Sequence, residues 1–156
     1  MPQSLANVWL HTVFSTRNRQ RVFLQGDMRD ATCSYMTGIL QEIDCSVARI
    51  NVTADHVHIL HQLCRTRTIA DVVGTVKRRT TDWVVEQEWA QGNLDFHNFH
   101  WQHGYGTFSV SESATVDVKK YIDTQEEHHR RMTFQDEYRA LLRKHGIDFD
   151  ERYVWD

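Results

Sequence analysis

Proline is almost absent from this chain of 156 residues, whose single proline is Pro2. Clusters of proline, glycine and serine mark loops and linkers between domains, and the sequence contains none, nor any low-complexity tract or internal repeat. A chain of this length suffices for one domain with a substantial core. We therefore expect residues 1–156 to form a single domain.

Cysteine and long apolar runs are also scarce. The three cysteines, Cys33, Cys45 and Cys64, lack the close paired spacing of zinc or disulfide motifs, so we expect reduced thiols packed as small apolar groups. No apolar run approaches the roughly twenty residues that span a bilayer, and no signal peptide is recognisable. The sequence thus favours a soluble, cytoplasmic protein without a membrane partner.

An excess of positive charge, which is common in nucleic-acid-binding proteins, is missing as well, because the formal net charge is −3. The basic residues are nevertheless clustered, as in Arg17-Asn18-Arg19 and Lys77-Arg78-Arg79. Local potential governs phosphate binding more than the average charge does. Both clusters are candidate DNA contacts, although the second equally fits the solvated face of a helix.

Apolar periodicity predicts alternating strands and helices. Strands are expected at 5–14, 45–52, 56–63 and 106–111, and helices at 28–44, 69–84, 114 to about 130, and from Thr133 to a left-handed C-cap at Gly146. The first six elements follow the order strand, helix, strand, strand, helix, strand. This order predicts a ferredoxin-like α+β fold, with an antiparallel sheet and helices packed mainly on one face.

A His-apolar-His triplet lies within the third predicted strand. Strand side chains alternate between faces, so His56 and His58 project on the same side while Val57 points to the other. Two imidazoles placed in this way can bind a metal ion, and they also fit a purely structural role. Asp55, just before the triplet, either orients one of these histidines or shapes the turn that enters the strand.

The predicted helix over 114 to about 130 carries a tyrosine and a glutamine four residues apart. Tyr121 and Gln125 would share one stripe of that helix, and His129 would lie one turn further along it. Taken alone, these residues also fit an interfacial aromatic, a solvated amide and a histidine at a helix end.

Other histidines are weaker candidates for a metal site. His97, His100 and His103 recur every third residue, but they lie in a predicted irregular loop without a carboxylate or cysteine to complete a structural site. His11 and His61 are expected to be strand histidines with local hydrogen-bond partners.

Taken in order, these segments resemble the single-tyrosine HUH transposases of small bacterial insertion sequences, the IS200-like family. The resemblance runs nearly end to end, through the segments 14–19, 55–58, 99–111, 121–129 and 153–156. It implies the same ferredoxin-like architecture and an enzyme that cuts and rejoins single-stranded DNA. It further implies Tyr121 as the nucleophile that joins a 5′ phosphate, and His56, His58 and Gln125 as the ligands of Mg²⁺ or Mn²⁺.

The resemblance also implies a homodimer, in which the tyrosine-bearing helix of one subunit can complete the metal site of the other, and a partner DNA with hairpin-bearing element ends. His129 is a substitute metal ligand or supporting group in this interpretation. By the Irving–Williams order, nickel, copper and zinc should bind such a site more tightly in vitro, so affinity alone does not identify the physiological ion.

A phenol, with a pKa of about 10, is a poor nucleophile at neutral pH and needs a metal or base to assist it. A phosphotyrosine linkage retains much of the energy of the broken phosphodiester, so a 3′ hydroxyl can reseal the DNA without ATP. Two alternatives stay open: a domesticated repeat-processing DNA-nicking enzyme, and a non-catalytic nucleic-acid-binding module on the same sheet.

Overall fold

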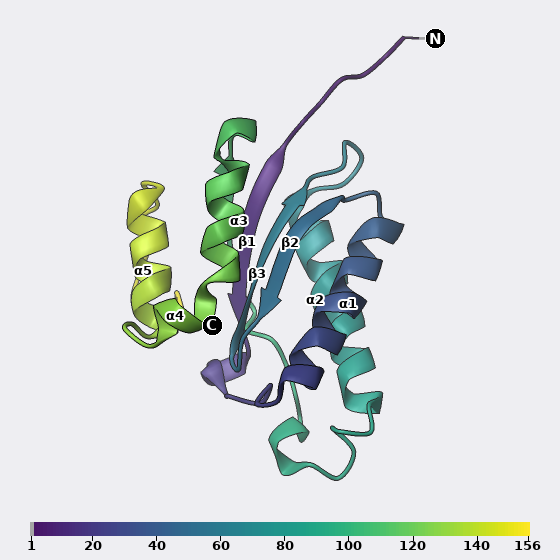
Figure 1. Ribbon diagram of the computed structural model, residues 1–156, viewed down its shortest axis with the longest axis vertical. Helices are drawn as coiled ribbons and strands as arrows, with labels where there is room; N and C mark the ends of the chain where they lie inside the picture. The colour runs from purple at the N-terminus through teal and green to yellow at the C-terminus, as the bar shows by residue number, and fades with distance from the viewer. Residues whose placement is uncertain (1) are drawn as a thin grey trace.

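A computed structural model describes residues 2–156 (Figure 1). Within this range, four strands form one antiparallel sheet in the order β2-β3-β1-β4. The strands are β1 (Trp9–Ser15), β2 (Val47–Val52), β3 (His56–Gln62) and β4 (Gly106–Val110). The helices are α1 (Gly26–Glu42), α2 (Ile69–Glu86), α3 (Thr115–Asp123), α4 (Gln125–His129) and α5 (Phe134–Lys144), with short 3₁₀ turns η1 (Arg17–Arg19), η2 (Leu94–Phe96) and η3 (Glu112–Ala114).

The two central strands, β1 and β3, are buried along nearly their whole length. Because strand side chains alternate, β3 sends Val57 and Ile59 to one face and His56 and His58 to the other. The pairing sets His58 opposite Val13 of β1. The two histidines therefore lie at the centre of the sheet and not at an exposed edge.

The two long helices, α1 and α2, pack on the face that carries Val57 and Ile59 (Figure 1). Thr68 begins α2 as its N-cap, and its side chain accepts a hydrogen bond from Asp71 N at 3.1 Å, which satisfies one of the free amides of the first turn. The helix buries an apolar stripe formed by Val72, Val73, Val76 and Val84. Most of the apolar core lies between the sheet and these two helices, and this packing holds the sheet in place.

The short helices α3, α4 and α5 lie on the other side of the sheet (Figure 1). A second apolar cluster joins this sheet face to α5, and it consists of Val13, Phe108, Phe134, Tyr138, Leu141 and Leu142. Ile122 anchors α3 because its side chain is fully buried, and its carbonyl accepts a hydrogen bond from Asn51 Nδ2 at 2.8 Å. The histidine face thus looks into the space between the sheet and these helices.

The predicted α+β fold, element order and antiparallel sheet are confirmed, with shifts of a few residues at the boundaries. The two long helices share one face, and the short C-terminal helices add a layer on the other. The helix expected over 114–130 is interrupted at Thr124 (φ −103°, ψ 24°), which separates α3 from α4. Gly146 follows α5 with φ +67°, as predicted for a left-handed C-cap.

Cys33, Cys45 and Cys64 are free thiols. Among the described residues, no helix is both long enough and apolar enough to cross a bilayer.

Candidate active site

Two buried histidines form the floor of the candidate site. His56 and His58 have exposed side-chain fractions of 1% and 0%, and both project from β3 towards the short helices. A buried imidazole needs a polar partner for each of its ring nitrogens. The partners of these two rings define the rest of the site.

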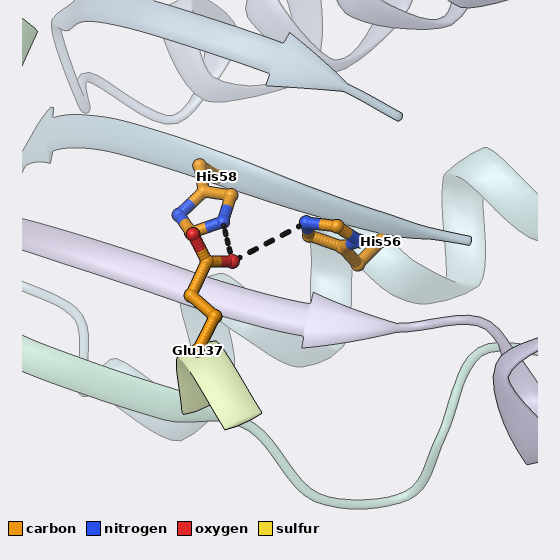
Figure 2. Close-up of side chains that lie close together, drawn as sticks. All are labelled: His56, His58 and Glu137. Carbon is orange, nitrogen blue, oxygen red and sulfur yellow. Dashed lines mark hydrogen bonds and ion pairs between the residues drawn. The ribbon is translucent and has the colours of Figure 1, made fainter. Parts of the chain in front are cut away.

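Glu137 of α5 is the carboxylate that both histidines face (Figure 2). Its Oε1 lies 2.9 Å from His58 Nε2 and 3.5 Å from His56 Nε2, and its own side chain is 1% exposed. The candidate ligand atoms of the three residues all lie within 4.8 Å of one another. Two imidazole nitrogens and one carboxylate oxygen are a donor set that divalent transition metals bind. The residues present therefore fit the divalent ion that the sequence led us to expect.

The far ring nitrogens of the two histidines have partners of their own. His56 Nδ1 lies 2.7 Å from Asp55 Oδ1 and 2.8 Å from Thr53 Oγ1. His58 Nδ1 lies 2.8 Å from His11 Nε2. Such partners fix the orientation of an imidazole and select which nitrogen carries its proton. Asp55 thus contacts the histidine beside it.

Gln125 and His129 lie on the edge of the same cluster. Gln125 is fully buried, and its Oε1 is 3.4 Å from His56 Nε2 and 3.0 Å from His129 Nε2. His129 Nε2 also lies 3.2 Å from Glu137 Oε1. The structure therefore brings together the histidines and glutamine expected from the sequence, but a residue that sequence reasoning missed, Glu137, faces both His56 and His58.

The tyrosine on α3 is joined to the cluster through the same carboxylate. The phenolic hydroxyl of Tyr121 donates a hydrogen bond of 2.5 Å to Glu137 Oε2, and its ring packs against His128 at a centroid distance of 4.7 Å. Burial, followed by the Glu137 carboxylate, raises the pKa of Tyr121 above its usual range. The phenol is therefore held in its protonated form in this arrangement.

The charges in the cluster depend on one another. Burial alone would raise the pKa of Glu137, but hydrogen bonds from His129, His56 and His58 outweigh it and hold that pKa far below its usual range. Burial lowers the pKa of His58. Burial also opposes the charged form of His56, but the carboxylates of Asp55 and Glu137 outweigh it and raise that pKa. Glu137 is thus a buried carboxylate anion surrounded by imidazoles, and it can act as a ligand for a cation.

Two clefts flank the cluster. One, of about 690 Å³, reaches His56 and Gln125 and is lined by four arginines, which are Arg21, Arg29, Arg130 and Arg131. The other, of about 680 Å³, lies between α3 and α5 and reaches Tyr121, Glu137 and His11. Met132 lines both clefts. Tyr121 therefore borders one cleft and His56 borders the other.

The first predicted DNA-binding cluster lies next to the site. Arg17, Asn18 and Arg19 form η1, and the preceding Thr16 donates its backbone N–H to Asp55 O at 2.8 Å. Arg17 and Asn18 are exposed, whereas the Arg19 guanidinium lies 5.6 Å from the ring centroid of Trp155. The loop is thus fixed to the turn that begins the histidine strand.

In the second predicted DNA-binding cluster, Lys77-Arg78-Arg79, two of the three side chains contact other parts of the protein. Lys77 points inward from α2, and its Nζ donates hydrogen bonds to the carbonyls of Gln102 (2.8 Å) and Gly104 (2.6 Å). Burial lowers the pKa of Lys77 to about 8. Arg79 pairs with Glu42 at 2.7 Å, which leaves Arg78 as the exposed member of the cluster. All three residues belong to the helix layer opposite the histidines.

The remaining histidines lie outside the candidate metal site. His97, His100 and His103 are exposed, and within residues 2–156 the group close enough to hold a metal is His56, His58 and Glu137. His61 has the local partner that the sequence led us to expect, Thr12 Oγ1 at 2.8 Å. His11, by contrast, bonds to a histidine of the candidate site.

The sequence contains a pattern that indicates a functional role for Glu137. It lies on the buried stripe of α5, with Phe134, Tyr138 and Leu141. An acidic residue on the apolar stripe of an amphipathic helix is costly to bury unless a charged or polar partner awaits it. That pattern could have identified Glu137 as a functional candidate.

The sequence also matches a known protein family. A family model described as "Transposase IS200 like" matches residues 4–125, a range that includes His56, His58, Tyr121 and Gln125 and ends before Glu137. The ISDra2 transposase TnpA of Deinococcus radiodurans is 26% identical over 122 residues, which cover 74% of this chain and 81% of the relative.

Two solved structures share the fold. One is a crystal structure from D. radiodurans R1 assigned as a transposase, with a TM-score of 0.62, 18% identity, and coverage of 80% of this chain and 95% of that one. The other is a REP-associated tyrosine transposase bound to a REP hairpin, with a TM-score of 0.54, 14% identity, and coverage of 83% and 74%. Because the family model spans most of the sequence, the chain belongs to the IS200-like transposases, a family of HUH tyrosine transposases.

Proposed function

We propose that this protein cleaves and rejoins single-stranded DNA by attack of Tyr121 on a phosphodiester, which leaves a 5′-phosphotyrosine intermediate. The observation that carries the proposal is the position of Glu137. One oxygen of its carboxylate accepts the hydrogen bond of the Tyr121 hydroxyl, and the other faces His56 and His58. The candidate nucleophile and the candidate metal ligands therefore meet at one side chain.

His56, His58 and Glu137 would hold the divalent ion, and Gln125 and His129 lie close enough to replace or support one of them. Mg²⁺ and Mn²⁺ are the ions that the family resemblance favours. A bound divalent ion supplies positive charge, which polarises a scissile phosphate and stabilises the charge that builds on its oxygens.

The residues of this chain account for the remaining steps. Burial and Glu137 hold the Tyr121 phenol protonated until positive charge enters the site. Glu137 Oε2 is the acceptor within hydrogen-bond reach of the phenolic proton. As Tyr121 Oη forms its bond to phosphorus, the bond from phosphorus to the 3′ oxygen breaks, and that oxygen takes up a proton from water and leaves as a hydroxyl. Attack by a 3′ hydroxyl on the phosphotyrosine reverses these changes and reseals a strand.

The arginine-lined cleft is the proposed path of the DNA backbone. Arg21, Arg130 and Arg131 are exposed residues that line it, and the cleft reaches His56 directly. Arg17, Asn18 and Arg19 extend the basic surface at the nearby end of β1. Of the α2 cluster, Lys77 and Arg79 are already engaged, so Arg78 is the member best placed to contact DNA that extends to the opposite layer.

The proposed partner is single-stranded DNA that carries a hairpin near the cleavage site. One solved relative is described as bound to a REP hairpin, and that relative shares the fold of this chain. A homodimer, on the family resemblance, and a cytoplasmic location complete the proposal. The same relative favours the second candidate function, a repeat-processing nicking enzyme that retains the chemistry but does not mobilise its own gene.

A denaturing-gel assay tests the proposal. Purified protein is incubated with end-labelled single strands from the DNA that flanks its gene, with Mn²⁺, Mg²⁺ or EDTA, and with the same DNA in double-stranded form as a control. We expect a covalent protein–DNA band with single strands and a divalent ion, and none with EDTA. Cleavage without an adduct would contradict the tyrosine mechanism, and hairpin binding without cleavage would favour a non-catalytic module. Joining of cleaved ends to a second strand separates a transposase from a nicking enzyme.

A further inference from the structure

A third histidine lies behind the candidate metal site. His11 projects from β1 on the same sheet face as His58, and its side chain is buried. Its Nε2 lies 2.8 Å from His58 Nδ1, and the two rings stack with centroids 5.1 Å apart at an interplanar angle of 29°. The His11 ring also makes edge-to-face contacts with the rings of Phe108 and Tyr121, at centroid distances of 6.1 and 5.9 Å. Packing on several sides therefore fixes the position of this imidazole.

The contact determines which nitrogen of His58 can bind a metal. A neutral imidazole has one nitrogen with a proton and one with a free lone pair. His58 Nε2 faces Glu137, so it is the nitrogen positioned for the ion. For Nε2 to offer its lone pair, Nδ1 must carry the proton, and the acceptor in reach of that proton is His11 Nε2.

We propose that His11 is a positioning residue, which holds the His58 ring and accepts a hydrogen bond from its Nδ1–H, so that Nε2 is free to bind a divalent ion. The inference rests on the proposed metal site and adds a residue to it. Without an ion, the same contact can run in the reverse direction: His11 Nε2–H donates to His58 Nδ1, and His58 Nε2–H donates to Glu137 Oε1. The exchange between the two states needs no net gain or loss of protons by the pair.

His56 differs from His58 in this respect. Its Nδ1 faces the Asp55 carboxylate, which can only accept a hydrogen bond when it is ionised. Asp55 therefore favours one proton position on His56 at all times. His11 can donate or accept, so the structure gives His58 a partner that suits both the free and the metal-bound forms of the ring.

Two variants of His11 separate hydrogen bonding from packing. His11→Phe keeps an aromatic ring but cannot accept a hydrogen bond, whereas His11→Gln loses the ring but offers a carboxamide oxygen, which accepts a hydrogen bond, near the position of Nε2. His61→Phe is the matched control, because His61 is also a buried histidine of the central strands but bonds to Thr12 on the opposite face. The measurement is the Mn²⁺ affinity of each purified protein by titration calorimetry, with folding checked by circular dichroism.

We expect His11→Phe to weaken Mn²⁺ binding about tenfold or more, in the range typical of lost supporting partners of metal-bound histidines. His11→Gln should stay within about threefold of the wild type, and His61→Phe should leave the affinity unchanged. Wild-type affinity in folded His11→Phe, or a larger loss in His11→Gln than in His11→Phe, would overturn the proposal. Absence of Mn²⁺ binding by the wild type would instead contradict the metal site itself.

A spectroscopic measurement on the wild type does not depend on any variant. Nitrogen-15 NMR of histidine-labelled protein distinguishes ring nitrogens that carry a proton from those that do not. With Zn²⁺ as a diamagnetic probe, we expect His58 to be protonated at Nδ1 and metal-bound at Nε2. An unprotonated Nδ1 in the Zn²⁺-loaded protein would overturn the assignment of His11 as the acceptor.

Discussion

The hydroxyl of Tyr121 donates a hydrogen bond to Glu137 Oε2, and this contact joins α3 to α5 across the candidate site. The other oxygen of the same carboxylate lies 2.9 Å from His58 Nε2. Glu137 therefore couples the protonation or metal binding of the histidines to the state of the Tyr121 phenol. This coupling leads to testable expectations about the nucleophile, the ligands and the packing that supports them.

Tyr121→Phe should abolish covalent adduct formation and lower DNA cleavage by about three orders of magnitude or more, because the variant lacks the attacking oxygen. DNA affinity should stay within about threefold, since the ring and its packing against His128 are retained. The check is a paired gel-shift and cleavage assay on the same oligonucleotide. Normal cleavage by the variant would rule out Tyr121 as the nucleophile.

Glu137→Gln should weaken Mn²⁺ binding at least about tenfold, because it removes the anionic ligand while keeping the shape of the side chain. Gln125→Leu is the matched comparison, and it should have a smaller effect because Gln125 Oε1 is 3.4 Å from His56 Nε2 and faces one histidine of the pair. Calorimetric titration of both proteins with Mn²⁺ gives the two affinities. A larger loss in Gln125→Leu would favour the ligand set expected from the sequence.

Gly106→Ala should destabilise the protein by about 1–3 kcal/mol through steric overlap. A Cβ at this position would lie 2.6 Å from Tyr138 Cε2 and 3.0 Å from Phe108 Cζ. Gly74→Ala, within α2, is the control: its Cβ would meet nothing within 4 Å, and alanine should stabilise the helix by about 0.5–1 kcal/mol. Urea unfolding measures both changes. Equal stabilities of the two variants would contradict the tight packing of β4 against α5.

The stability contributed by His61 should depend on pH. Burial lowers its pKa, so below about pH 6.5 the unfolded state takes up a proton that the folded state refuses, and stability is lost as pH falls. His61→Gln removes this loss, and its destabilising effect should therefore be smaller at pH 5.5 than at pH 7.5. The difference should be at most about 1.4 kcal/mol, because pH 5.5 lies about one unit below the pKa of an unfolded-state histidine. Urea unfolding at both pH values measures it, and an equal effect would contradict a neutral, buried His61.

Much of the fold could be predicted from the sequence because its signals are local. The period-two alternation around His56 and His58 indicated a strand with both imidazoles on one face, and the apolar stripe from Ile69 to Val84 indicated α2. Gly146 marked the end of α5 through its conformational freedom. Each of these features depends on neighbours within a few residues along the chain.

The contacts that complete the site depend on tertiary packing instead. Glu137 reaches the histidines because α5 folds back over the sheet, and His11 meets His58 because β1 pairs with β3 in one register. The sequence predicts one helix over 114 to about 130, whereas the backbone of Thr124 separates α3 from α4. Local patterns do not encode such long-range pairings.

The most direct test of the central claim is to locate the covalent bond. Trypsin should release the adduct as a peptide that begins after Lys120 and ends at Arg130, with Tyr121 as its sole tyrosine. After nuclease trimming of the DNA, tandem mass spectrometry should find a nucleotide joined through its 5′ phosphate to the Tyr121 oxygen. This modification should appear only in reactions with a divalent ion. A nucleotide on another residue, or cleaved DNA without any modified peptide, would contradict the account.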